Sequence, residues 1–183
     1  MALSKIDTAA IATDAIEAAQ LKSDAIAVGD LPTGTVLQTV RHEWSNQTIV
    51  TSQSLTLLSG SGKTVTTQAA NSKFAIWVQG MAYRSDSGNN GFGVALYRGS
   101  TRIQSPYSNW SAGSAHGPGN SGAVSSAYHL VMLDTPNVAA GTSLDYNLYG
   151  IVHTSGQTVY FNYAGSWSGL VNASNMIIQE IAG

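Results

Sequence analysis

Cysteine is absent from the 183 residues of this sequence, and charged residues are few. Without cysteine there can be no disulfide, no thiolate nucleophile and no zinc–thiolate site. Charged residues make up 10% of the chain and the formal net charge is −2, whereas about a quarter of the residues in a typical soluble protein are charged. The electrostatic signature of a nucleic-acid-binding protein is therefore missing. A neutral surface rich in Gly, Ser, Thr and Asn is more typical of an extracellular or virion protein than of a cytosolic enzyme.

Long apolar runs and a signal peptide are missing as well. No apolar stretch approaches the roughly 18 residues that a membrane-spanning helix requires. The first residues do not follow the charged-then-apolar order of a secretory signal. We therefore expect neither nucleic acid nor membrane insertion, and we expect release from a cell by lysis or on a particle.

Recognisable catalytic and cofactor motifs are also lacking. Gly60–Thr64 reads GSGKT, but a phosphate-binding loop requires a glycine at the position of Leu57 and a helix afterwards. A polar turn between strands is the favoured interpretation. No pair of carboxylates suggests a glycosidase, and no Gly-x-Ser-x-Gly segment suggests a serine hydrolase. We predict no enzyme activity, no catalytic residue, no cofactor and no metal site.

Histidines are few, and none stands at metal-ligand spacing from another: the four are His42, His116, His129 and His153. His129 and His153 fall in expected strands, where a role in the sheet or at an interface is favoured. A trimer can nevertheless build a metal or anion site on its axis from one residue per chain. The sequence leaves that alternative open.

What the sequence does have is a five-residue repeat at its start. After Met1, a large apolar residue occupies every fifth position: Ile6, Ile11, Ile16, Leu21, Ile26 and Leu31. On an α-helix, five residues turn about 140° net, so no apolar stripe forms. On a strand, an odd step alternates between faces. Several chains wound about one axis could bury these residues, so residues 1–33 predict an intertwined fibrous stalk, most simply a trimer. An Ala-rich, partly disordered leader, or local helical turns, are the alternatives.

Residues 34–183 predict a separate head made of strands. Pro32 and Gly34 mark the boundary, and Lys73–Tyr83 is the strongest strand. Its apolar residues fall on both faces, which is typical of a central strand or of one that faces a neighbouring subunit. The frequent turns and the absence of a convincing helix favour an all-β, antiparallel jelly-roll sandwich. The expected strands are Thr35–Arg41, Ile49–Leu58, Thr64–Gln68, Lys73–Tyr83, Gly91–Arg98, Thr101–Gln104, Ala127–Leu133, Ser143–Val152, Thr158–Tyr163 and Asn175–Ile181.

Aromatic residues in expected loops are the best functional signal. Flat rings stack on sugar C–H faces, and neighbouring Asn and Ser offer hydrogen bonds to hydroxyls. Tyr, Ser, Gly and Asn together also form adaptable protein-binding surfaces. The alternative is that each ring packs against the sandwich or a neighbouring subunit. The candidate receptor-binding residues are Trp44, Tyr107, Trp110, His116 and Trp167.

Four segments together resemble a known family. These are the pentads (KIDTAAIATDAIEAAQLKSDAI), the junction GDLPTGTVLQTV, the segment ALYRGSTRI and the terminal MIIQEIAG. They resemble tail-fibre and appendage proteins of phages that infect cyanobacteria and other marine bacteria. The resemblance implies a homotrimer with a slender N-terminal stem. It also implies a jelly-roll head, similar to the complement C1q and tumour-necrosis-factor heads, whose loops contact host glycans or proteins.

These observations lead to one functional hypothesis with two alternatives. We expect a structural virion protein, a short trimeric tail fibre on the particle surface, whose head binds a host-surface polysaccharide or protein. The stalk would attach to a baseplate, tail or capsid protein, because the pentads begin at Met1 without a separate docking domain. A capsid head fibre or decoration protein is the first alternative, and a host-encoded C1q-like lectin is the second.

Overall fold

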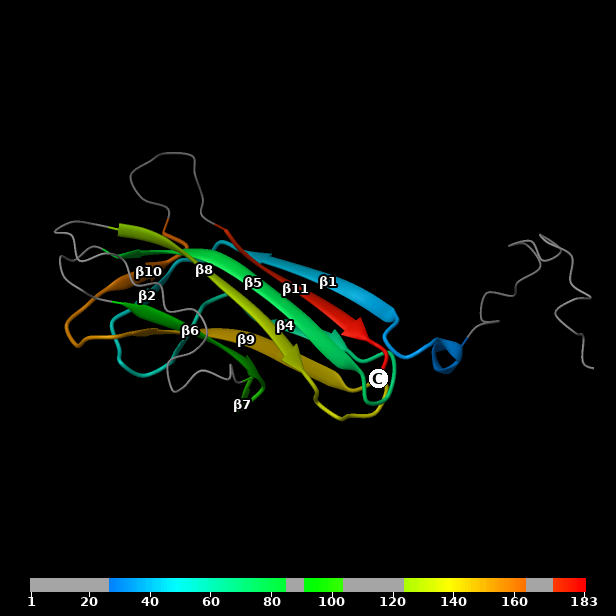
Figure 1. Cartoon of the computed structure of the whole chain (residues 1–183). Coiled ribbons are helices and arrows are strands. Elements are labelled where there is room, and N and C mark those ends of the chain that lie inside the picture. The colour runs from blue at the N-terminus through cyan, green and yellow to red at the C-terminus, as the bar shows by residue number, and fades with distance from the viewer. Residues whose placement is uncertain (1–26, 85–90, 104–123, 164–172) are drawn as a thin grey trace, which may run out of the picture.

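The head is an antiparallel β-sandwich, as the sequence predicts. The structure, a computed structural model, describes residues 27–84, 91–103, 124–163 and 173–183. Two sheets lie face to face along the whole length of the head (Figure 1). The described part of the chain has one short 3-10 turn, η3 (Val28–Asp30), and contains no helix long and apolar enough to cross a membrane. The prediction of an all-β jelly-roll sandwich is confirmed.

The first sheet is built around its longest strand. It consists of β1 (Val36–Trp44), β2 (Thr48–Val50), β5 (Lys73–Arg84), β8 (Val124–Asp134), β10 (Val159–Phe161) and β11 (Ser174–Ile181). β8 pairs along almost all of β5. The other edge of β5 is shared: β11 pairs with its first part and β10 with its last three residues. β1 and β2 follow as the outer strands, so β5 is central, as the two-sided apolar pattern predicts.

The second sheet covers the inner face of the first. It consists of β3 (Thr56–Leu57), β4 (Lys63–Thr66), β6 (Phe92–Arg98), β7 (Thr101–Arg102) and β9 (Ser143–Val152). β9 pairs with β6 on one edge and with β3 and β4 on the other. Gly99 adopts a positive φ of 55° in the turn between β6 and β7, which confirms the hairpin predicted at Gly99-Ser100.

The core lies between the sheets and follows strand alternation. On β5, Phe74, Ile76 and Val78 point inward and are buried, while the residues between them point outward. Fully burying one such side chain contributes about 1.5–3 kcal/mol. The remaining large core residues are Val50, Leu58, Val65, Phe92, Val94, Leu96, Tyr128, Leu130, Met132, Leu144, Tyr146, Leu148, Val152, Val159, Phe161, Met176 and Ile178.

One expected strand is wrong in its extent. Ile49–Leu58 was predicted as a single strand, but β2 pairs with β10 in the first sheet and β3 pairs with β9 in the second. The chain changes sheets between them, where the backbone N–H of Ser54 donates to Oγ of Ser52 at 2.9 Å. β-branched and apolar residues continue through this crossing, so the sequence pattern does not mark it. Most other strands differ from their predicted bounds by one to three residues, and Ser143–Val152 is the same in both.

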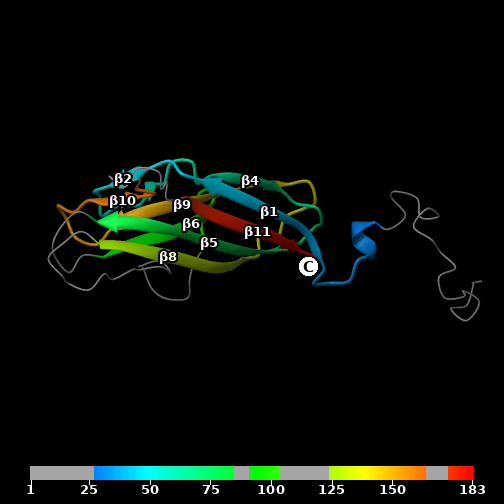
Figure 2. The same ribbon diagram turned by 90° about the horizontal axis from the view of Figure 1, so that it is seen from above.

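The chain enters the head at the end where it also finishes. Gly34 N–H donates to the carbonyl of Ala182 at 2.9 Å, and Ala182 N–H donates to that of Thr35 at 2.8 Å. Figures 1 and 2 show that residues 27–35 approach the end of the sandwich at which β11 ends. Leu31, half-buried, is the last pentad position. The other stalk positions, Ile6, Ile11, Ile16, Leu21 and Ile26, lie outside the described residues.

Candidate interaction surfaces

The structure corrects the interpretation of Trp44. This residue does not lie in a loop; it ends β1, opposite Ser174 of β11, and is 5% exposed. β1 runs three residues beyond Arg41, its predicted end. The indole faces the core and stacks on His42 at a centroid distance of 5.5 Å. The side chain of Asn162 donates to the Trp44 carbonyl at 3.2 Å. Trp44 therefore stabilises the head and does not offer an open ring to a receptor.

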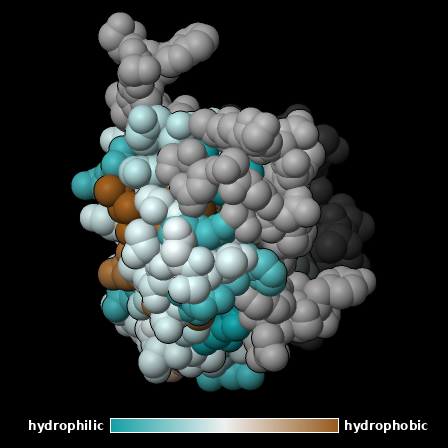
Figure 3. Space-filling model, turned by 90° about the vertical axis from the view of Figure 1, so that its left-hand side faces the viewer, coloured by the Kyte–Doolittle hydropathy of each residue, from teal (hydrophilic) through white to brown (hydrophobic). Residues whose placement is uncertain are grey.

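The remaining candidate receptor residues are not placed by this structure. Tyr107, Trp110, His116 and Trp167 lie outside the described residues, so their contacts stay predictions. The segments that contain them connect β7 to β8 and β10 to β11. Figure 3 views the head from the end opposite residues 27–35, and most of the described surface there is polar or neutral in hydropathy.

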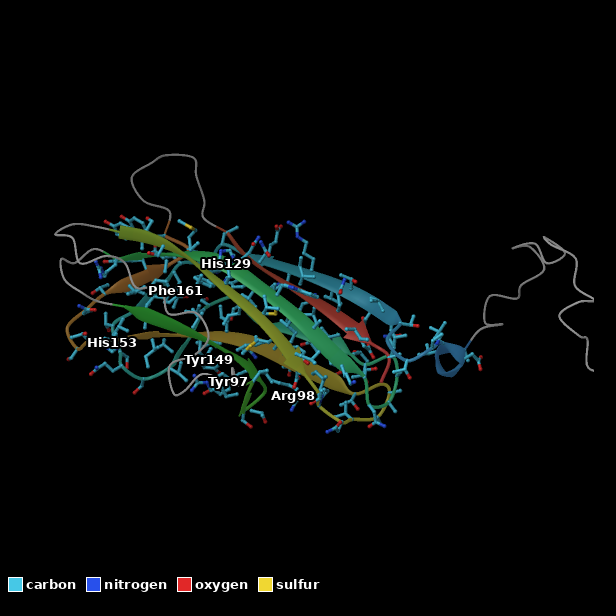
Figure 4. The ribbon with its side chains drawn as sticks, in the orientation of Figure 1. Tyr97, Arg98, His129, Tyr149, His153 and Phe161 are labelled. Atoms are coloured by element: carbon cyan, nitrogen blue, oxygen red, sulfur yellow. The ribbon has the colours of Figure 1, made fainter. Side chains whose placement is uncertain are left out.

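Histidines and carboxylates do not gather into a site within the described ranges. No group of three His, Asp or Glu side chains there could hold a metal ion. A ring nitrogen of His42 bonds to the Gly60 carbonyl at 2.8 Å. His129 is exposed on the first sheet, and His153 lies at the end of the head opposite residues 27–35 (Figure 4). The GSGKT segment leads from a turn into strand β4, which is the fold expected of a turn between strands.

A buried charge cluster joins the two sheets. Arg98 on β6 donates through Nη1 to both carboxylate oxygens of Asp134 on β8, each at 2.8 Å. The hydroxyl of Tyr146 on β9 donates to Oδ2 of Asp134 at 2.8 Å. Burial and the adjacent Asp134 carboxylate raise the pKa of Tyr146, so its hydroxyl stays protonated and remains a donor. Because each charge is paired and bonded, the cluster acts as a cross-link between sheets.

The outward face of the first sheet carries an apolar surface. Strand register brings Ile177, Trp77 and Val131 into one row across β11, β5 and β8. Leu133 lies two residues from Val131 on the same face of β8. Val131 is 70% exposed, Leu133 61% and Trp77 38%. We call these four residues the apolar face. Clustered exposed side chains of this size are typical of an interaction site.

A polar row borders the apolar face. Asn175, Gln79 and His129 lie side by side on the same three strands. Together with Trp77, Val131 and Ile177 they line a shallow groove of about 250 Å³. Farther along β5, Tyr83 stacks on Tyr163 at a centroid distance of 4.3 Å and contacts Tyr160 at 5.9 Å. The outward face of the first sheet thus carries an apolar patch and a tyrosine cluster with the polar row between them.

The outward face of the second sheet is different in character. Tyr97 and Tyr149 contact each other with ring centroids 4.7 Å apart. In the register of this sheet, Tyr97 lies between Arg102 of β7 and Asn147 of β9. Figure 4 shows the two tyrosines together on this sheet, with His129 on the other. We call Tyr97, Arg102, Asn147 and Tyr149 the tyrosine platform.

Sequence reasoning found only part of these surfaces. The two-sided pattern of β5 indicated that Trp77 could face a neighbouring subunit, but the outward positions Val131 and Leu133 were not assigned. The run of four apolar residues in HLVMLD, which places apolar side chains on both faces of a strand, was the available signal. The tyrosine platform was missed because Tyr97 and Asn147 become neighbours only through the pairing of β6 with β9.

Comparison with known proteins gives weak similarities only. No protein-family model and no curated protein matches the chain. The chain is similar to part of the T13 particle of infectious bursal disease virus, with a TM-score of 0.35, 9% identity and coverage of 82% of this chain and 36% of that one. Dimeric latent PorU from Porphyromonas gingivalis has a TM-score of 0.37 and 9% identity, over 82% of this chain and 14% of that one. Infectious bursal disease virus strain Gt has a TM-score of 0.27 and 10% identity, over 81% of this chain and 39% of that one. The chain spans well under half the length of each, and similarities this weak carry no functional argument.

Proposed function

We propose that this chain is a structural virion protein that works as a homotrimeric appendage. Residues 1–33 form its stalk, and residues 34–183 form a head that binds a host-surface receptor. The observation that carries the proposal is the apolar face, since Val131 and Leu133 are mostly exposed in the isolated chain. A second and third copy of the head would remove these side chains from water, at about 25 cal/mol for each Å² of apolar surface buried.

The placement of the stalk supports the same assembly. The pentads cannot bury their apolar residues within one chain, and they lead into the head beside its C-terminal end. Three heads joined side by side would therefore have their stalks at one end. The opposite end, where β5 ends and β6 begins, and the outward faces of the second sheet remain available to a receptor. Several weak receptor sites on one particle bind strongly through effective concentration.

The oligomeric state tests the assembly. Size-exclusion chromatography with light scattering on the full-length protein is expected to give three times the mass of the 19.1 kDa chain. A monomer at micromolar concentration would contradict the proposal. Immunogold labelling of particles from the virus that encodes this chain then tests where on the particle the protein lies. Label at the tail supports a tail fibre, label over the capsid supports a decoration protein, and unlabelled particles would exclude both.

A further inference from the structure

We propose that the tyrosine platform binds an acidic sugar, that is, a saccharide ring that carries a carboxylate. The inference rests on the proposed receptor-binding function and names the class of glycan. It also assigns a place on the head that differs from the apolar face, because the platform lies on the outward side of the opposite sheet. An assembly through the first sheet would not use this second face.

The two tyrosine rings provide the stacking surface. Tyr149 on β9 lies opposite Ala95 on β6, and Tyr97 is the next outward residue along β6. The rings are half-buried and inclined at 54° to each other. Ala95, whose side chain is small, separates the two tyrosines in the register and is almost fully buried. Both tyrosines are partly exposed, and aromatic rings of this kind can receive the C–H face of a sugar.

Arg102 supplies the charge that selects an acid. It lies directly opposite Tyr97 on the same outward face. The ion pairs in the described part of the chain are Arg41–Glu43 and Arg98–Asp134, and neither uses Arg102. A guanidinium group offers a planar fork of donors that matches a carboxylate in a bidentate manner. The residue is half-buried, so its charge is less screened by solvent than that of a fully exposed arginine.

Asn147 completes the site on the other side of Tyr97. Its amide can both donate to and accept from sugar hydroxyls. A Cβ at Gly62 would lie 2.7 Å from Oδ1 of Asn147, so glycine leaves room for this amide. Asp145, two residues away on β9, accepts a hydrogen bond from the Thr64 hydroxyl. Its negative charge would repel a sugar carboxylate, so we expect the carboxylate to lie at the Arg102 end.

Binding of matched sugars by the full-length protein tests the proposal. The probes are oligosaccharides of galacturonate, glucuronate and mannuronate, each paired with its carboxyl-reduced neutral counterpart, in isothermal titration calorimetry. At least one acid is expected to bind with at least about tenfold higher affinity than its neutral counterpart. The affinity should fall as salt is added, because the contact is between charges. Equal binding of every acid and its counterpart, or no binding at all, would overturn the proposal.

Variants locate the site. Arg102→Gln is expected to reduce binding of the acid about tenfold and to leave binding of the neutral sugar unchanged. Arg102→Lys keeps the charge but loses the planar fork of donors, so its affinity for the acid should lie between those of the parent and of Arg102→Gln. The matched control is Arg41→Gln, an exposed arginine of the other sheet, which should bind as the parent does. An Arg102→Gln protein that binds acid normally would place the site elsewhere. Light scattering on the same samples separates the two proposals, because an intact trimer that ignores acidic sugars contradicts only this one.

Discussion

Individual polar side chains in the core of the head hold loops to strands. Glu180 of β11 is fully buried and has no ion-pair partner within the described ranges. Its Oε1 accepts from the backbone N–H groups of Gln68 at 2.7 Å and Ala69 at 3.1 Å. Gln38 donates to its other oxygen. One carboxylate thus fixes the connection after β4 to the first sheet.

Removal of this carboxylate tests the role. Glu180→Gln keeps the size of the side chain but turns an acceptor into an NH₂ donor that faces other donors. We expect the free energy of unfolding to fall by about 1–3 kcal/mol, the cost of an unsatisfied buried group. Urea denaturation monitored by circular dichroism measures this free energy. Glu43→Gln, at an exposed position, is the control; equal stability of both variants would contradict the assigned role.

Buried tyrosines make the head sensitive to alkali. Desolvation raises the pKa of Tyr128 to about 12, although its hydrogen bond with Ser174 lowers it. The folded state therefore binds more protons than the unfolded state above pH 10, the usual tyrosine pKa. The contribution of Tyr128 to the free energy of unfolding is complete below pH 10 and is lost as the pH rises through about 12. Thermal melts across this range should show a falling melting temperature. Tyr128→Phe should reduce the slope, and an unchanged slope would count against Tyr128 as a source.

At the scale of strands, the pairing of β5 with β8 creates the apolar face. Val131→Glu places a charge where a neighbouring copy would exclude water, at a cost of several kcal/mol for an unpaired buried charge. Because Val131 is 70% exposed, the change should leave the folding of a single head intact. We expect the trimer to dissociate at a higher protein concentration in light scattering, with a circular dichroism spectrum unchanged from the parent. Ser125→Glu, on the same face of β8 beside Tyr83, tests how far the interface extends.

Strands were largely predictable from the sequence, and their partners were not. The alternation in Lys73–Tyr83 and Ser143–Val152 gave both strands and their buried residues, because period-two patterning follows directly from strand geometry. The end of β1 was missed, because HEW after Arg41 carries a charge and a polar ring within the pattern. The Trp44 prediction failed for this reason. Surfaces that need register between distant strands, such as Tyr97 beside Asn147, cannot be read from one segment alone.

At the scale of the whole molecule, the stalk and the head are expected to contribute separately to assembly. The described core lies entirely within residues 34–183, so deletion of residues 1–26 should leave the head folded. The deletion removes the pentad positions up to Ile26. We therefore expect a trimer that dissociates at higher concentration than the full-length protein, measured by analytical ultracentrifugation. If deletion left the dissociation constant unchanged, the pentads would have no role in association.

The hydrogen bond from Gly34 to the Ala182 carbonyl holds the C-terminal residues beside the start of the head. It therefore determines where a fused sequence would lie. A peptide tag or fluorescent protein fused after Gly183 would lie at the end of the head beside residues 27–35. Such a fusion should leave the far end unobstructed, so labelled protein can be used to test whether the head adheres to cells. Conversely, a cargo meant to meet a cell surface must be inserted at the far end, for example in the turn at Gly156 between β9 and β10.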